Sequence, residues 1–85
     1  MTFFKKLELG LQDGQNSNRE VVLFTTCGRL RLTSIKSFEW SSEDHMESVR
    51  HVMIAGQIEH ANGIASATVT LARECIMGIM VLSPQ

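Results

Sequence analysis

The sequence predicts a mainly β fold, a small and strongly bent antiparallel barrel of five strands that follows a short N-terminal helix. Two observations favour it: apolar and polar residues alternate over much of residues 20–82, and turn-forming residues separate the apolar runs. A length of 85 residues leaves room for one domain with a modest core. We expect a helix and loop over residues 1–18 and the barrel over residues 20–82.

The first segment favours a helix over residues 2–11. Phe4, Leu7 and Leu11 share one helical face, and Thr2 stands before them as a cap. Alternation of leucines in the same segment leaves a strand as the other interpretation. Residues 12–18 are polar turn formers without apolar partners, which predicts an exposed loop.

A β-hairpin is predicted next. The apolar run 21–24 is followed by Cys27 and Gly28 as a turn and then by a second alternating strand. The alternation slips between Leu32 and Ile35, which predicts a strand that bends at a bulge.

A second hairpin follows a polar and acidic segment, 41–47, which we expect to be a loop or a single helical turn. Residues 52–61 lead into Asn62 and Gly63, a pair typical of a type I′ turn, which needs positive φ at both central positions. Residues 64–71 continue as the fourth strand.

The last strand is predicted over residues 76–82, after a tight turn at 72–75 and before Pro84. The competing interpretation is a long helix that starts at Ser42 and runs through the fourth strand. Gly63 would then lie inside the helix, at a cost of about 1 kcal/mol. The strand interpretation is the one we adopt.

The composition restricts the function. A formal net charge of −1 and a pI near 6.3 argue against a protein that coats duplex nucleic acid through a basic face. Cys27 and Cys75 lie far apart in the sequence, which suggests reduced cysteines. No stretch reaches the roughly 18 apolar residues of a membrane span. We expect a soluble, cytoplasmic chain.

Enzyme chemistry is not indicated. His45, His51 and His60 do not have the spacing of zinc ligands, and no nucleophile with its base or phosphate-binding loop stands out. We expect neither catalysis nor a cofactor or metal.

Five strands with a bend in the second suggest an SH3-like barrel, and one run within it resembles a known family. Gly28, Arg29, Ile35, Phe38 and Glu39 match the spacing of the first motif of Sm, LSm and Hfq-type proteins, with Glu39 in place of the usual Asp. The resemblance implies an Sm-like barrel.

The continuation of this motif fits only when residues 39–42 are treated as inserted. Residues 43–49 then resemble the family pattern, with Met46 in place and Glu47 where the family has Asn. A carboxylate only accepts hydrogen bonds and repels phosphate, so this replacement weakens the expectation of base recognition.

The second family motif resembles Ile76, Gly78 and Val81, with Met77 where the family has Arg. The resemblance implies a homo-oligomeric ring of five to seven subunits, in which the fourth strand of one copy pairs with the fifth strand of the next. It also implies single-stranded RNA as the ligand. The candidate RNA-binding residues are Trp40, His45, Met46, Arg73, Met77 and Gly78.

Each candidate also has a plain structural interpretation. Trp40 can pack in the core, His45 can be an ordinary loop residue, and Arg50 and Arg73 can be solvated surface charges.

Other functions stay open. The acidic residues at 39, 43, 44 and 47 argue against RNA at the usual place, because they repel phosphate, and their plain interpretation is a solvated loop. A cation or a basic protein surface is the alternative ligand, the latter as in a protein-interaction or inhibitory module of viral or mobile-element origin. A helical dimer with a short N-terminal hairpin is a third hypothesis. The hypothesis we carry forward is a non-catalytic Sm-like ring that binds RNA or scaffolds an RNA-related complex.

Overall fold

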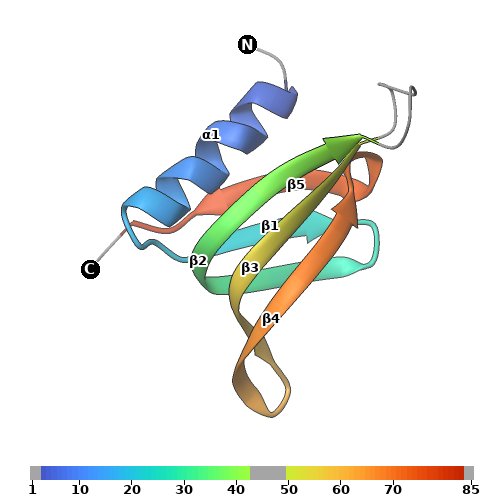
Figure 1. Ribbon diagram of the computed structural model, residues 1–85. Coiled ribbons are helices and arrows are strands. Elements are labelled where there is room, and N and C mark those ends of the chain that lie inside the picture. The colour runs from blue at the N-terminus through green and yellow to red at the C-terminus, as the bar shows by residue number, and fades with distance from the viewer. Residues whose placement is uncertain (1–2, 43–49, 84–85) are drawn as a thin grey trace.

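The computed structural model describes residues 3–42 and 50–83, with the backbone alone for Phe4, Ser41, Ser42 and Arg50. The chain is mainly β, with one N-terminal helix and an antiparallel sheet of five strands, as predicted (Figure 1). The elements in chain order are α1 (Phe3–Asn16), β1 (Val21–Thr25), β2 (Gly28–Ser42), β3 (Arg50–His60), β4 (Gly63–Ala72), the 3-10 turn η1 (Arg73–Cys75) and β5 (Ile76–Val81).

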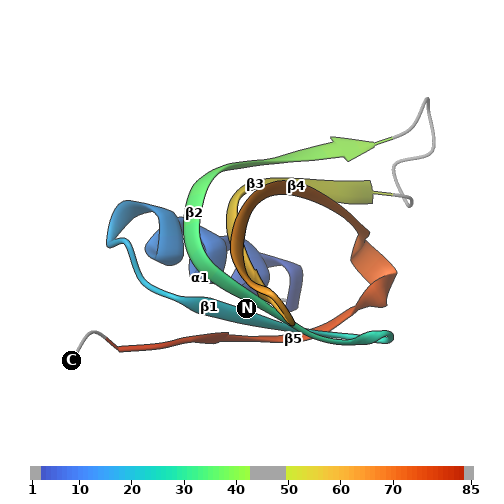
Figure 2. The same ribbon diagram turned by 90° about the horizontal axis from the view of Figure 1, so that it is seen from below.

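The strands form one open sheet in the order β4-β3-β2-β1-β5. Strand β2 is 15 residues long and pairs with β1 through its first half and with β3 through its second half. Figure 2 shows β2 curving so that the two halves of the sheet face each other. Hydrogen bonds do not close the sheet, and β4 and β5 are its two edges.

The bend of β2 has two causes in its pairing with β3. The register shifts between Leu32 and Ser34 and again between Ile35 and Ser37, and each shift adds a residue to β2 and increases its curvature. Between the two shifts, Gly56 of β3 lies against β2. A Cβ added there would stand 2.2 Å from the carbonyl oxygen of Ser34. The predicted bend and bulge are therefore confirmed.

Helix α1 covers the end of the bent sheet and contacts β1, β2 and β5. Leu7 and Leu11 are fully buried, in agreement with the predicted helical face. Two glycines bring the helix close to the sheet: a Cβ on Gly10 would lie 2.7 Å from Ile79, and one on Gly14 would lie 2.5 Å from Val21.

The helix is longer than predicted. It continues to Asn16, so the loop expected over residues 12–18 is wrong for Gln12–Asn16. The residues that extend it look like turn formers in the sequence, but Gly14 packs on the sheet and Gln15 donates a hydrogen bond to the carbonyl of Lys36 at 3.0 Å. Tertiary contact here overrides a weak local preference.

The long helix considered from Ser42 onward is wrong, because Arg50–His60 and Gly63–Ala72 are strands. The second hairpin is confirmed, but its turn is not of type I′. His60 pairs with Gly63 across Ala61 and Asn62, and among the described residues Asn18 is the one non-glycine with positive φ. Within residues 60–63, positive φ is confined to Gly63, where it costs no Cβ strain.

Smaller boundary differences concern one turn and one loop. The first hairpin turns at Thr26 and Cys27, one residue before the predicted pair, because Thr25 pairs with Gly28. The loop predicted over residues 41–47 is wrong at Ser41 and Ser42, which belong to β2, and its other residues lie outside the described part of the chain.

The core fills the space between the two halves of the sheet and the helix. Its buried side chains come from α1 and from strands β1, β2, β3 and β5. They are Leu7, Leu11, Val21, Leu23, Leu32, Ile35, Val52, Ile54 and Ile76.

We predict that Gly56→Ala lowers the free energy of unfolding by about 2 kcal/mol, because the new methyl group meets backbone that cannot move without changing the bend. Gly10→Ala is the matched control. Its methyl group meets the mobile end of Ile79, and a gain of about 1 kcal/mol in helix propensity offsets that contact. Urea unfolding at one protein concentration, followed by circular dichroism, measures both. Equal stability of Gly56→Ala and the wild type would contradict the close approach.

Candidate functional site

Side chains of types that can contact RNA lie at one end of the sheet, where β2 ends, β3 begins and β4 ends. Cross-strand pairs place Trp40 opposite Val52, and His51 between Ser41 and Ala72. Arg73 follows Ala72 in η1, which contacts β3. An indole, an imidazole and a guanidinium therefore lie at the same end of the sheet, called the loop end below.

Trp40 is half-buried and packs against the core. Directly paired residues project from the same face of a sheet, and the partner of Trp40 is the fully buried Val52. His51 is the next residue along β3 and therefore projects from the opposite face. Packing accounts for the position of Trp40, and its exposed part is what remains for contact with a base.

Arg73 lies in η1, the connection from β4 to β5, and Met77 and Gly78 lie in the first half of β5. Arg73 is half-buried, whereas Met77 is 67% exposed, beside the register shift that separates the pairs formed by Ile76 and Gly78. Gly78 lies under Phe24, because a Cβ there would be 3.6 Å from that ring. Met77 thus presents a thioether to solvent beside the position occupied by Gly78.

His45 and Met46, the other two candidates, lie outside the described residues. The same holds for the acidic residues 43, 44 and 47, and the side chain of Arg50 is not described. Glu39 is exposed on β2 and pairs across the sheet with Met53.

The sequence analysis named His51 only when it excluded zinc spacing for the histidines, and it did not place His51 at this end of the sheet. Its position depends on the pairing of β3 with β2 and with β4. The second hairpin could have indicated the pair of residues 51 and 72, had its turn been placed at residues 61 and 62.

The two free edges are the second candidate site. Leu82 donates its N–H to the carbonyl of Glu20 at 2.9 Å, which makes these residues a hydrogen-bonded pair of the antiparallel ladder. Bonded and non-bonded pairs alternate, so the backbone groups of Val81 and Ile79 point away from β1. Within residues 3–42 and 50–83, the outer edge of β5 therefore presents donors and acceptors that no other strand pairs with.

A charged network crosses the sheet near these edges. Arg31 donates to Glu20 at 2.6 Å, and its Nε lies 3.6 Å from a carboxylate oxygen of Glu59. The hydrogen bond and the charge of Glu20, followed by the charge of Glu59, raise the pKa of Arg31 above its ordinary value. The guanidinium is thus paired with two carboxylates.

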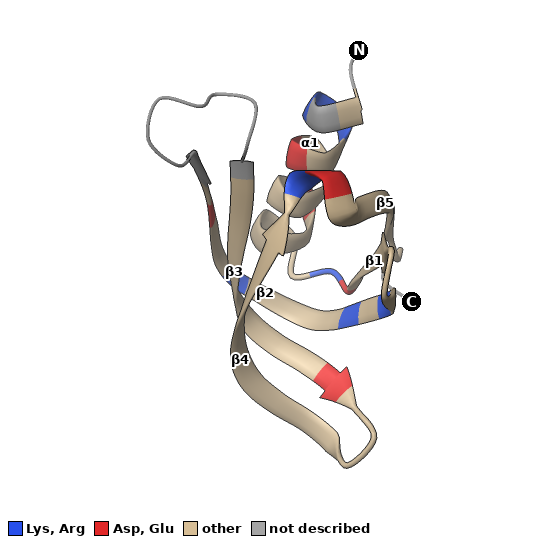
Figure 3. Ribbon diagram, turned by 90° about the vertical axis from the view of Figure 1, so that its right-hand side faces the viewer, with Lys and Arg blue, Asp and Glu red and all other residues tan. Residues whose placement is uncertain are grey.

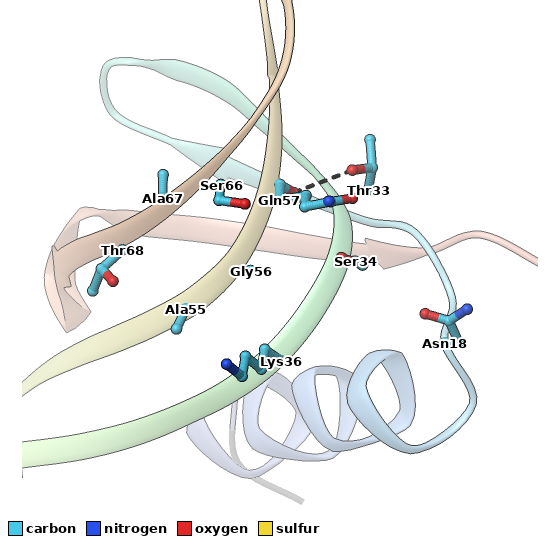
Figure 4. A pocket seen from close by; sticks show the side chains of 10 residues that line it. All are labelled: Asn18, Thr33, Ser34, Lys36, Ala55, Gly56, Gln57, Ser66, Ala67 and Thr68. Atoms are coloured by element: carbon cyan, nitrogen blue, oxygen red, sulfur yellow. Dashed lines mark hydrogen bonds between the residues drawn. The ribbon is translucent and has the colours of Figure 1, made fainter.

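A groove of about 880 Å³ lies at the bend of β2, away from the loop end (Figure 4). Hydroxyl and amide side chains line it together with small residues and one cation, Lys36. Thr33 donates to the carbonyl of Gln57 at 3.3 Å, so one hydroxyl is already used. The groove is open and polar, and no aromatic side chain lines it.

Charges are distributed without a continuous basic stripe in the described part of the chain. Figure 3 shows Lys and Arg segments separated by acidic and neutral ones along the ribbon. Residues 3–42 and 50–83 contain no group of three His, Cys, Asp or Glu that could hold a metal ion. Among the same residues no helix is long and apolar enough to cross a membrane. Both cysteines are free thiols.

Comparison with models of protein families, with curated protein sequences and with solved structures gives no match to this chain.

We predict that Trp40→Ala lowers the free energy of unfolding by about 3 kcal/mol, because the indole packs against the core. Trp40→Phe, which keeps an aromatic ring in place, should lose less than half of that amount. Urea unfolding followed by far-ultraviolet circular dichroism compares the two variants with the wild type. An alanine variant as stable as the wild type would show that packing does not explain this residue.

Proposed function

We propose that the protein is a non-catalytic subunit of an Sm-like homo-oligomeric ring, in which the free edge of β4 in one copy pairs with the free edge of β5 in the next. The single observation that carries this proposal is the open sheet with β4 and β5 as its edges. An unpaired edge is a template for another strand, and pairing around a closed ring removes every edge.

The arrangement of elements supports the Sm-like assignment. A helix precedes five antiparallel strands, the second strand is long and bent, and a 3-10 turn leads into the fifth. The residues that resemble the family motifs lie in the strands expected from that resemblance. Gly28 is the first residue of β2, Phe38 lies in the second half of β2, and Gly78 lies in β5.

The size of the chain supports assembly. A domain of 85 residues buries only about 60 to 65% of its unfolded surface and is marginally stable alone. Large apolar side chains are exposed on both edge strands, namely Ile64 on β4 and Met77 and Met80 on β5. Contact between copies would bury more apolar surface.

We expect the wild-type chain to have a solution mass that is a multiple of 9.5 kDa, with five to seven copies from the family resemblance. Val81→Pro removes an N–H that points to the free edge of β5 and should reduce the mass toward that of one copy. Val81→Ala loses a similar amount of packing, keeps the N–H and should remain assembled. Light scattering and native mass spectrometry measure all three. A monomeric wild type contradicts the ring.

For the ring we propose single-stranded RNA as the ligand, bound at the loop end. Trp40 on one face of the sheet and His51 on the other supply rings for stacking on bases, and Arg73 supplies a charge for phosphate. Each site is weak alone, but a ring repeats it in every subunit, and one RNA strand that reaches several copies binds with added strength. The low net charge limits this affinity and makes it depend on local contacts.

We expect oligo-uridine or oligo-adenosine to bind at low salt and to bind more weakly at higher salt, because phosphate contacts release counterions. Arg73→Gln should weaken binding about tenfold, which is the order expected for one charged hydrogen bond. Lys36→Gln removes the same charge at the bend of β2 and should leave binding nearly unchanged. Fluorescence anisotropy at two salt concentrations measures this.

Absence of RNA binding at low salt would favour the second candidate, a ring or module that binds a basic protein surface. The acidic residues between positions 39 and 47 are the observation that favours it. Repeated in every subunit, they would form a negative surface that attracts cations and repels phosphate.

A further inference from the structure

The two cysteines of the chain are distant in the sequence but lie in segments that contact each other in the fold. Cys27 is in the turn between β1 and β2, and Cys75 is the last residue of η1. The N–H of Thr26 donates to the carbonyl oxygen of Cys75 at 3.0 Å, which joins the turn directly to η1. Figures 1 and 2 show both segments at the same end of the ribbon.

This backbone contact brings the cysteines near the separation of a disulfide. Residues that exchange a hydrogen bond between antiparallel strands have Cα atoms about 5.5 Å apart, and a disulfide joins Cα atoms about 4.4 to 6.8 Å apart. Cys27 follows Thr26 directly, so its Cα lies only about 3.8 Å from the Cα of Thr26. The contact of Thr26 with Cys75 therefore leaves a short movement between the two cysteines.

The surrounding backbone allows such a movement. Neither cysteine belongs to a strand. Beside η1, the pairing of β5 with β1 shifts in register between Phe24 and Thr25, so the ladder is already irregular there. The tip of the turn can approach η1 and leave the strand pairs on either side intact.

The two thiols differ in access to solvent. Both are free, Cys27 is exposed and Cys75 is partly buried. An exposed thiol reacts with an external oxidant first, and a second thiol beside it then resolves the product. Exposure assigns the first step to Cys27 and the second to Cys75.

We propose that Cys27 and Cys75 form a reversible disulfide within one chain when a low-molecular-weight disulfide oxidises the protein; this inference does not depend on the proposed ring. The Cys27 thiolate attacks one sulfur of the oxidant, the S–S bond of the oxidant breaks, and one thiolate leaves. The Cys75 thiolate then attacks the sulfur of Cys27 and releases the second thiolate. The protein gives up two electrons and two protons, and the oxidant becomes two thiols.

The bond would change what the chain can do on unfolding. It closes a loop from residue 27 to residue 75, which contains β2, β3 and β4. Closing a long loop restricts the unfolded chain more than the folded one. Oxidation would therefore stabilise the fold at the irregular start of β5, and reduction would reverse this.

The first experiment measures how well the fold aligns the two thiols. The chain is equilibrated with reduced and oxidised glutathione, quenched with acid and analysed by mass spectrometry, once in native buffer and once in urea. The ratio of closed to open chain gives the effective concentration of one thiol toward the other. We expect a native value about tenfold or more above the value in urea, because folding brings the two segments together. A native value equal to or below the value in urea overturns the proposal.

The second experiment tests the order of the two steps with matched serine variants. Cys75→Ser should stop at a mixed disulfide between Cys27 and glutathione, whereas Cys27→Ser should form its mixed disulfide more slowly, because Cys75 is partly buried. Circular dichroism checks that both variants fold. In the wild type, peptide mapping without reductant should find residue 27 linked to residue 75. A mixed disulfide that persists on Cys27 of the wild type overturns the proposal.

A third measurement separates a bond within one chain from a bond between copies. Wild-type chains with and without a nitrogen-isotope label are mixed before oxidation. Linked peptides should come from one chain each, and peptides that join a labelled to an unlabelled chain overturn the proposal. A monomeric chain that closes the bond contradicts the ring alone, and an assembled chain that does not close it contradicts the disulfide alone.

Discussion

The close approach of β3 to β2 at Gly56 determines the shape of the sheet. A side chain at this position would overlap the backbone of Ser34, so the glycine lets β3 follow β2 through the bend. Two register shifts on either side of this contact supply the extra residues that a curved strand needs. Without the bend, the two halves of β2 would not enclose a common core, and α1 would have no concave end to cover.

The bend also decides where the sheet is incomplete. Because β2 pairs with β1 through one half and with β3 through the other, the strands beyond these two end as edges. The helix fills the open end of the core through Leu7 and Leu11, but it contacts β5 by its face and leaves the backbone edge uncovered. The packing of α1 on the sheet therefore leaves the backbone edges of β4 and β5 without a neighbouring strand in the described sheet.

The sequence predicted the five strands and the position of the bend, because period-two alternation and a slip in it reflect burial directly. It failed where tertiary contact decides. Residues 12–16 look like a loop but continue the helix, since Gly14 packs on Val21. The end of the sheet that holds His51 depends on which residues pair across strands, and a single sequence does not state register when turn geometry differs by one residue.

Backbone pairing at a strand edge is strong but does not distinguish one strand from another, because every residue presents the same groups. Selectivity must come from side chains beside the edge. Arg31 beside these edges is already paired with two carboxylates, whereas the exposed side chains of the edge strands include Ile64 on β4 and Met77 and Met80 on β5. A strand with a charged side chain opposite one of these apolar residues would leave that charge desolvated. The apolar side chains of the edges therefore restrict which strands pair with them.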